Sequence, residues 1–217
     1  TWNPVTGCLR GCSYCYAHRI ANRFQGHFEP CFYPERLNEP TKVKKPSRIF
    51  VGSMTDLVSS WIPQNWIDRV VEACWQASWH TYIFLTKDPW QYERLQTEKV
   101  CTWRPWTGAT CEGKDGPKKS EALVLHSGSE IRFINFEPLL SDPSETFEWD
   151  AFDWMSWVIV GAQTGPGAKP PKPEWVQAII DGCRAEHVPL FIKNNVKWPE
   201  KIQEDIKEGA SLMMSGS

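Results

Sequence analysis

Residues 48–87 read RIFVGSMTDLVSSWIPQNWIDRVVEACWQASWHTYIFLTK, and this stretch decides the fold. It contains two short apolar runs, 48–52 and 81–85, which have the length and the aromatic and β-branched composition of buried strands. Between them, residues 64–77 carry apolar side chains at spacings of three and four, as one face of an amphipathic helix does. A strand, a helix and a second strand in this order indicate parallel strands.

The same alternation continues on both sides of this stretch. Further apolar runs of strand length are 107–111, 131–136, 157–161 and 190–192. Further segments that read as helices are 17–24, 88–96, 116–125 and 173–185. We therefore expect an α/β fold, a partial parallel barrel of the (β/α)6 type. We also expect a single domain over residues 1–217, with a C-terminal extension from about residue 194.

Composition and charge exclude several classes of protein. The chain has 217 residues, of which 41% are hydrophobic, enough for one ordinary core. Its 24 basic and 26 acidic residues give a formal net charge of -2, which excludes a polybasic protein that grips nucleic acid by bulk charge. No apolar run approaches about 18 residues and nothing reads as a signal peptide, so we expect no membrane span and a cytoplasmic location.

Three of the eight cysteines lie within residues 8–15, CLRGCSYC. Spacings of four and three place Cys8, Cys12 and Cys15 around one loop, where their sulfurs can face a single metal centre. Three thiolates without an obvious fourth ligand indicate an iron–sulfur cluster with one open iron, which can bind a substrate or cofactor. The remaining cysteines are scattered singly, and a chain of this length without a leader favours a reducing compartment over a disulfide framework.

Polar residues follow every predicted strand. They include Ser53, Thr55 and Asp56, then Lys87, then Thr110 and Glu112, then Glu137, then Gln163, and finally Lys193. In a parallel barrel the carboxyl ends of the strands lie on one rim, where active sites are built. We therefore expect a binding site at this rim, opposite the cysteine loop.

The spacing Cys-x3-Cys-x2-Cys, with Tyr14 directly before the last cysteine, resembles the signature of radical S-adenosylmethionine (radical SAM) proteins. Other motifs resemble the phage Gp37/Gp68 family, also called DUF5131: TWNPVTGC at 1–8, ERLNEP at 35–40, FVGSMTD at 50–56, LTK at 85–87, EPLL at 137–140 and VIVGAQTGPG at 158–167. The cysteine loop and strand-end motifs also resemble, remotely, those of spore photoproduct lyase, a radical SAM enzyme that repairs a DNA lesion. The sequence departs from the family pattern at Ala162 and Gln163, where Gly and Glu are expected.

The resemblance implies a [4Fe–4S] cluster on Cys8, Cys12 and Cys15, with SAM bound at its open iron. One electron from the cluster would cleave SAM into methionine and a 5′-deoxyadenosyl radical. Tyr14 and the backbone around Gly161 and Gln163 would line the adenine, and Ser53, Thr55 and Asp56 would receive the methionine amino group. Lys87 would pair with the SAM carboxylate, and Thr110 and Glu112 would bind the ribose hydroxyls.

Two further residues are candidate catalytic groups. Glu137 faces the expected mouth and would contact substrate, and Cys111 would donate a hydrogen atom to a product radical unless it only fills the core. The resemblance also implies a low-potential electron donor, flavodoxin or ferredoxin. The likeness to the lyase is the one reason to favour a nucleobase or nucleic-acid substrate. The sequence does not specify an oligomeric state.

Two alternatives stay open. Cys8, Cys12, Cys15 and His18 would supply a structural zinc set, and Arg10, Arg19 and Arg23 with Trp2 and Tyr14 would then form a nucleic-acid contact patch. The second alternative is a catalytically degenerate phage accessory protein that keeps the cluster but binds partners. SAM turnover separates this protein from the enzyme, and metal identity separates both from the zinc module.

Overall fold

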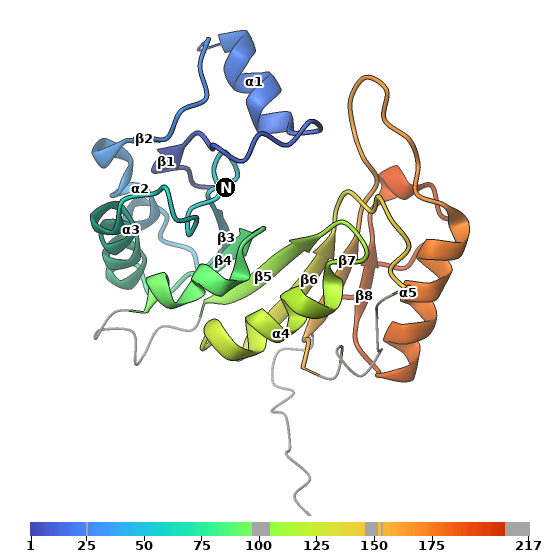
Figure 1. Ribbon diagram of the computed structural model, residues 1–217. Coiled ribbons are helices and arrows are strands. Elements are labelled where there is room, and N and C mark those ends of the chain that lie inside the picture. Colours follow the sequence, from blue (N-terminus) through green and yellow to red (C-terminus); the bar gives the residue numbers. More distant parts are fainter. Residues whose placement is uncertain (25, 97–104, 146–151, 153, 207–217) are drawn as a thin grey trace, which may run out of the picture.

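The computed structural model describes residues 1–24, 26–96, 105–145, 152 and 154–206. Its centre is a sheet of six parallel strands that follow one another in sequence order and curl into a half-barrel (Figure 1). The strands are β3 (Arg48–Val51), β4 (Thr81–Thr86), β5 (Trp106–Cys111), β6 (Ile131–Phe136), β7 (Trp157–Val160) and β8 (Leu190–Ile192). The predicted partial parallel barrel is confirmed at this level, with strand bounds within one residue of those expected.

Helices cover the outer, convex face of the sheet (Figure 1). They are α3 (Gln64–Gln76), the 3-10 helix η2 (Pro89–Leu95), α4 (Gly116–His126) and α5 (Pro173–Ala185). In α3 the residues at helical spacing, Ile67, Val70 and Cys74, are buried, whereas Trp75 is exposed. Residues 88–96 were expected to form an ordinary helix, and the structure makes most of them 3-10. Within the described residues, no helix has both the length and the apolar character that crossing a membrane requires.

The N-terminal part forms a small layer beside β3 that the sequence did not predict. It consists of β1 (Val5–Thr6), α1 (Tyr16–Phe24), β2 (Cys31–Phe32), η1 (Pro34–Arg36) and α2 (Glu39–Lys42), and β1 pairs antiparallel with β2. Bridges from Trp2 to Val51 and from Gly7 to Thr55 attach this layer to the edge of the half-barrel. Of these elements, only α1 was anticipated from the sequence, as the predicted helix over residues 17–24.

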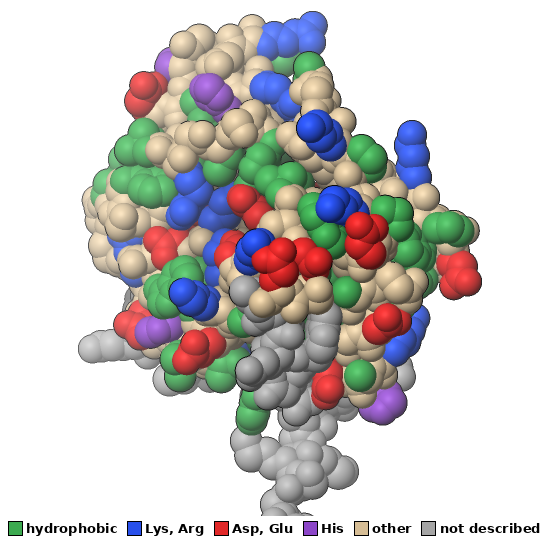
Figure 2. All heavy atoms as spheres, turned by 45° about the vertical axis from the view of Figure 1, so that its right-hand side comes forward, with side chains coloured by type: hydrophobic (Ala, Val, Ile, Leu, Met, Phe, Trp, Pro, Cys, Tyr) green, Lys and Arg blue, Asp and Glu red, His purple; other side chains and the backbone are tan. Residues whose placement is uncertain are grey.

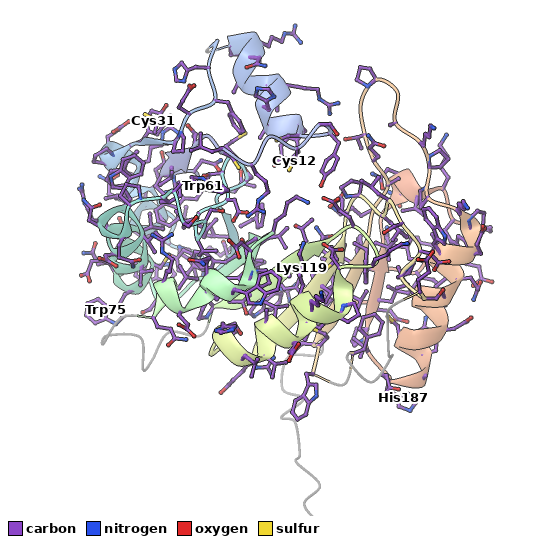
Figure 3. The ribbon with its side chains drawn as sticks, viewed as in Figure 1. Cys12, Cys31, Trp61, Trp75, Lys119 and His187 are labelled. Atoms are coloured by element: carbon purple, nitrogen blue, oxygen red, sulfur yellow. The ribbon has the colours of Figure 1, made fainter. Side chains whose placement is uncertain are left out.

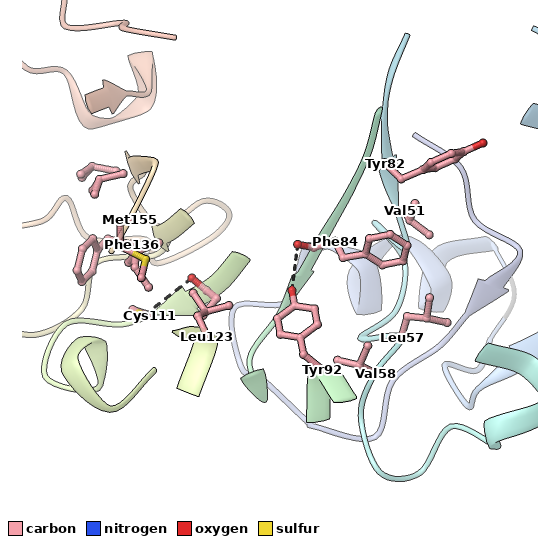
Figure 4. Close-up of a cluster of buried hydrophobic side chains, with 14 of the residues drawn as sticks. Val51, Leu57, Val58, Tyr82, Phe84, Tyr92, Cys111, Leu123, Phe136 and Met155 are labelled. Carbon is pink, nitrogen blue, oxygen red and sulfur yellow. Dashed lines mark hydrogen bonds between the residues drawn. The ribbon is translucent and has the colours of Figure 1, made fainter. Parts of the chain in front are cut away.

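Successive side chains of each strand point to opposite faces of the sheet. The convex face packs against the helices and forms the main hydrophobic core, which includes Phe84, Cys111 and Phe136 (Figure 4). The concave face carries a smaller cluster that includes Trp106 and Phe133. Gly108 permits this cluster, because a Cβ there would lie 2.3 Å from the Phe133 ring.

The chain after β8 runs back across the amino ends of the strands. Gln203 forms an antiparallel bridge with Phe191, and Ile206 joins the concave cluster beside Trp106 and Phe133. η5 (Asn194–Val196) begins this segment. The predicted C-terminal extension from about residue 194 falls partly in this segment, and residues 207–217 lie outside the described residues.

Candidate functional site

A cavity of about 610 Å³ lies at the carboxyl ends of the strands, between the cysteine loop and the concave face of the sheet. This volume is within the range of small-molecule sites. Sequence-predicted residues that line it are Cys8, Cys12, Tyr14, Cys15, Ser53, Thr55, Asp56, Lys87, Thr110, Glu137 and Gln163. The fold thus brings most of the predicted site residues to one cavity.

Backbone contacts at the start of the cysteine loop hold it over the cavity. The Gly7 amide donates to Met54 O at 2.8 Å, and the Cys8 amide donates to Phe28 O at 2.9 Å. Gly7 has a φ of +88°, and a Cβ there would lie 2.0 Å from Glu29 O, so no larger residue fits this turn. The loop leads directly into α1.

The three loop cysteines are free thiols that face the same cavity. Cys12 lies below α1 over the opening of the half-barrel, whereas Cys31 lies away from it on β2 (Figure 3). Burial raises the pKa of the Cys8 thiol, which favours its protonated form at neutral pH. Cys101 lies outside the described residues.

The donor chemistry of the loop fits a cluster with three protein ligands, because three unpaired thiols share one wall of the cavity. In the described part of the chain, however, no group of three or more His, Cys, Asp or Glu side chains is placed so that it could hold a metal ion. Cluster binding therefore requires the three thiols to turn towards a common point. His18 does not line the cavity, and its ring lies against Phe28 and hydrogen-bonds Asn22.

Tyr14, Lys87 and Glu112 form a closed polar network at one side of the cavity. The Tyr14 hydroxyl donates to Glu112 Oε1, and Lys87 Nζ donates to the Tyr14 hydroxyl oxygen at 2.6 Å and to Glu112 Oε1 at 2.9 Å. Burial and then the nearby Glu112 carboxylate raise the pKa of Tyr14. Burial alone would raise the pKa of Glu112, but hydrogen bonds from Tyr14 and Lys87 outweigh it and lower that pKa. Glu112 does not itself line the cavity, whereas its two partners, Tyr14 and Lys87, do.

The 53–56 turn is largely engaged in holding the cysteine loop. Ser53 Oγ donates to Asn3 Oδ1 at 3.1 Å, and Thr55 Oγ1 donates to Gly7 O at 2.7 Å. Asp56 is buried and accepts hydrogen bonds from Thr86 Oγ1 at 2.5 Å and from the Lys87 amide at 3.1 Å. Arg10 Nη2 of the loop approaches Asp56 to 3.5 Å, which adds a charge contact between loop and sheet.

Glu137 occupies the opposite side of the cavity. Its Oε2 accepts from Lys193 Nζ at 2.5 Å and from Asn135 Nδ2 at 3.3 Å. Gly161 does not line the cavity; it makes room for this carboxylate, because a Cβ there would lie 2.6 Å from Glu137 Oε1. The structure thus places Gly161 against the Glu137 carboxylate, and the adenine contact that the resemblance implied stays a prediction.

Cys111 is a predicted site residue that the structure places in the core and not at the cavity. It is fully buried in the main core near Phe136 and Met155 (Figure 4). Thr110 points into the cavity, so the next residue along β5 points to the convex face. Burial raises the pKa of the Cys111 thiol, as expected for a core side chain.

Arg10, Asn135 and Lys193 also line the cavity. From the sequence, Lys193 was named only among the polar residues that follow the strands, and Arg10 only for the zinc-module alternative. Asn135 was given no role, although it is a polar residue inside the apolar run 131–136. Arg10 lies within the cysteine loop. The face shown in Figure 2 carries basic and acidic side chains close together across its middle, in keeping with the near-neutral net charge.

These features define the class: an α/β half-barrel with a cavity at the carboxyl ends of its strands, covered by a three-cysteine loop. The chain belongs to the DUF5131 family, since the model of that family, described as a protein of unknown function, matches residues 1–216. Comparison with the curated proteins and with the solved structures found no match.

Proposed function

We propose that this protein is a radical SAM enzyme whose half-barrel is of the radical SAM kind. The observation that carries the proposal is that Cys8, Cys12 and Cys15 face the same cavity as the polar side chains at the strand ends. A three-thiol loop leaves one iron of a [4Fe–4S] cluster open to a ligand from that cavity. When bound, the cluster supplies the electron that cleaves SAM, drawn from a low-potential donor such as flavodoxin or ferredoxin.

The residues around the cavity fit recognition of a zwitterionic cofactor. Lys87 carries the positive charge that a carboxylate needs, and it lies beside the loop over the Tyr14 ring at 5.1 Å. Glu112 accepts hydrogen bonds from Tyr14 and Lys87 at present, and two ribose hydroxyls would replace those donors. SAM binding would therefore open the Tyr14–Lys87–Glu112 network. The engaged partners of Asp56 limit its role to holding the loop and one backbone amide in place.

Three further assignments belong to this proposal. The substrate is a nucleobase or nucleic acid, on the remote resemblance to spore photoproduct lyase alone. Glu137 contacts that substrate, because its side chain lines the cavity at the end of β6. An oxygen-sensitive cluster fits a cytoplasmic location.

The decisive experiment is anaerobic purification followed by iron and sulfide analysis, visible spectra before and after dithionite, and assay of 5′-deoxyadenosine after SAM is added. We expect about four irons per chain, a brown absorbance that bleaches on reduction, and 5′-deoxyadenosine formation. A colourless protein with one zinc ion would instead support the zinc-stabilised binding module. A cluster that never cleaves SAM would support the degenerate accessory protein.

A further inference from the structure

The cavity has two chemically different parts. Polar side chains gather beneath the cysteine loop and at the strand ends, and the part of the floor over β6 and β7 is apolar. Phe133, Trp157 and Ile159 form that floor, and the rings of Phe133 and Trp157 lie 6.3 Å apart between centroids at a tilt of 53°. Trp157 and Ile159 keep part of their surface accessible although they belong to a hydrophobic cluster. Such a floor suits the face of a flat ring.

A fixed pair of opposite charges stands above this floor. Phe133, Asn135 and Glu137 follow one another at a spacing of two along β6 and its end, so their side chains share the concave face. Lys193 reaches the same carboxylate from the end of β8. Both Lys193 and Asn135 bind Oε2 of Glu137, and within the described residues Oε1 has no hydrogen-bond donor.

This arrangement presents a hydrogen-bond acceptor and a donor side by side. Glu137 Oε1 can accept, and the Lys193 ammonium keeps two N–H groups beyond the one given to Oε2. The two charges cancel, so the pair favours neither an anion nor a cation. An anionic ligand would be repelled by the Glu137 carboxylate, and a cationic ligand by the Lys193 ammonium. A neutral ligand with an N–H donor beside a carbonyl acceptor satisfies both groups at once.

A buried side chain, that of Asn135, holds the Glu137 carboxylate in place. Asn135 is 5% exposed, and its Oδ1 is buried without a hydrogen-bond partner among the described residues. Among the described residues, its side-chain amide therefore makes one hydrogen bond, to Glu137 Oε2. A buried polar atom without a protein partner is costly, so Oδ1 calls for a partner from outside the chain, such as a water or a ligand. Asn135 is thus a positioning residue for Glu137.

We propose that the Glu137–Lys193 pair and the Phe133–Trp157 floor bind the substrate through a lactam edge, that is, a neutral planar heterocycle with a ring N–H beside a ring C=O. The ring N–H donates to Glu137 Oε1, and the ring carbonyl accepts from Lys193 Nζ. This inference rests on the proposed function in one respect, since it takes the part of the cavity beside the cysteine loop and Lys87 as the place of the cofactor. Pyrimidine and purine lactams are members of this class, as are lactams unrelated to nucleic acids.

The test is isothermal titration of the full-length protein with matched pairs of free heterocycles, without SAM or reductant. One pair is 2-quinolone and 1-methyl-2-quinolone, and the other is 1-methyluracil and 1,3-dimethyluracil. We expect the N–H member of at least one pair to bind saturably, and its N-methylated partner to bind about tenfold more weakly or worse, because methylation removes the donor and leaves Glu137 unpaired. A larger difference in affinity within the uracil pair would indicate a nucleobase, and a larger difference within the quinolone pair would indicate another lactam.

Variants locate the binding. Glu137→Leu and Lys193→Met should each weaken binding about fivefold or more, and Glu137→Leu should abolish the preference for the N–H ligand. Lys118→Met on α4, an exposed lysine outside the cavity, is the matched control and should change nothing. Circular dichroism checks that each variant is folded. Equal binding of both members of each pair, absence of binding by all four ligands, or insensitivity to both variants overturns the proposal.

Failure here is separable from failure of the radical SAM assignment. Binding is measured without a cluster or SAM, so a protein that binds lactams but never cleaves SAM keeps this subsite and loses the proposed chemistry. A protein that cleaves SAM but ignores the lactam edge keeps its chemistry and loses this subsite.

Discussion

Arg48 at the start of β3 and Asp205 in the segment after β8 form a two-pronged ion pair, with Arg48 Nη1 2.8 and 3.0 Å from the two carboxylate oxygens. The first and last strands of the half-barrel are thereby connected at their amino ends, away from the cavity. Arg48 also lies over the Trp106 ring at 4.8 Å, and Ile206, next to Asp205, packs with Trp106. The segment after β8, residues 193–206, thus crosses the amino ends of the strands, and we call it the strap.

Removal of this ion pair should lower stability slightly and in a pH-dependent way. Both side chains are well exposed, so the coupling energy from a double-mutant cycle of Arg48→Met and Asp205→Asn should be below about 1 kcal/mol at pH 7. The hydrogen bond from Arg48 lowers the pKa of Asp205 below its ordinary value of 3.8. A group with a lowered native-state pKa stabilises the fold above its ordinary pKa and loses that effect as the pH falls through the lowered value.

Urea unfolding at pH 7 and at pH 2.5 measures this coupling. It should be larger at pH 7 than at pH 2.5, because the pair weakens as the pH falls towards the lowered pKa of Asp205 and the carboxylate takes up a proton. A coupling energy of the same size at both values would show that charge is not what joins the strap to β3.

Gly108→Ala should destabilise the protein by about 1–3 kcal/mol, as overpacking of a core does. The new Cβ would lie 2.3 Å from the Phe133 ring, which is 2% exposed and has little room to move. Gly161→Ala is the matched comparison: its Cβ would meet the end of the Glu137 side chain, which can turn away, so the free energy of unfolding should fall less. Urea denaturation measures both, and the added substitution Phe133→Leu should partly rescue Gly108→Ala. Equal losses at the two glycines would contradict this account.

Tyr14→Phe should raise the pKa of Glu112 towards its ordinary value of 4.5, because the variant removes a hydrogen bond that lowers it. Carbon-13 NMR of the glutamate carboxyl groups across a pH titration measures the change. Lys87 remains a partner of Glu112, so the shift should be partial. Tyr33→Phe, whose ring lies against Arg36 outside the cavity, is the control and should leave the Glu112 titration unchanged. An unchanged Glu112 pKa in Tyr14→Phe would show that the network is not formed in solution.

Substitution of single cysteines should separate cluster ligands from core residues. Cys12→Ser should lose most of the iron after reconstitution, because two remaining thiolates hold a [4Fe–4S] cluster poorly. Cys111→Ala should keep the iron and lose about 0.5–1.5 kcal/mol of stability, as small deletions from a core do. Iron analysis and urea denaturation of both variants test this pair of expectations. Iron loss in Cys111→Ala with an intact fold would indicate that the Cys111 thiol takes part in cluster binding.

The sequence predicted the central fold well because the strands and helices of a parallel sheet are marked by local patterns. β6, β8 and α5 have the bounds expected from apolar runs and a Pro near the helix start. The small elements within residues 26–46 were missed, since β2 has only two residues and owes its place to pairing with β1. Such elements depend on contacts distant in sequence and leave little local signal.

The candidate site was foreseen in its parts and not in its connections. The loop spacing of Cys8, Cys12 and Cys15 and the polar residues after each strand are properties of the chain itself, readable without coordinates. Tertiary structure alone decided that Tyr14 meets Glu112, 98 residues away, and that Lys193 meets Glu137, 56 residues away. It also decided that Thr110 lines the cavity while Cys111 enters the core. The pleat of β5 sends neighbouring side chains to opposite faces of the sheet, and only the packing of the helices determines which face is buried.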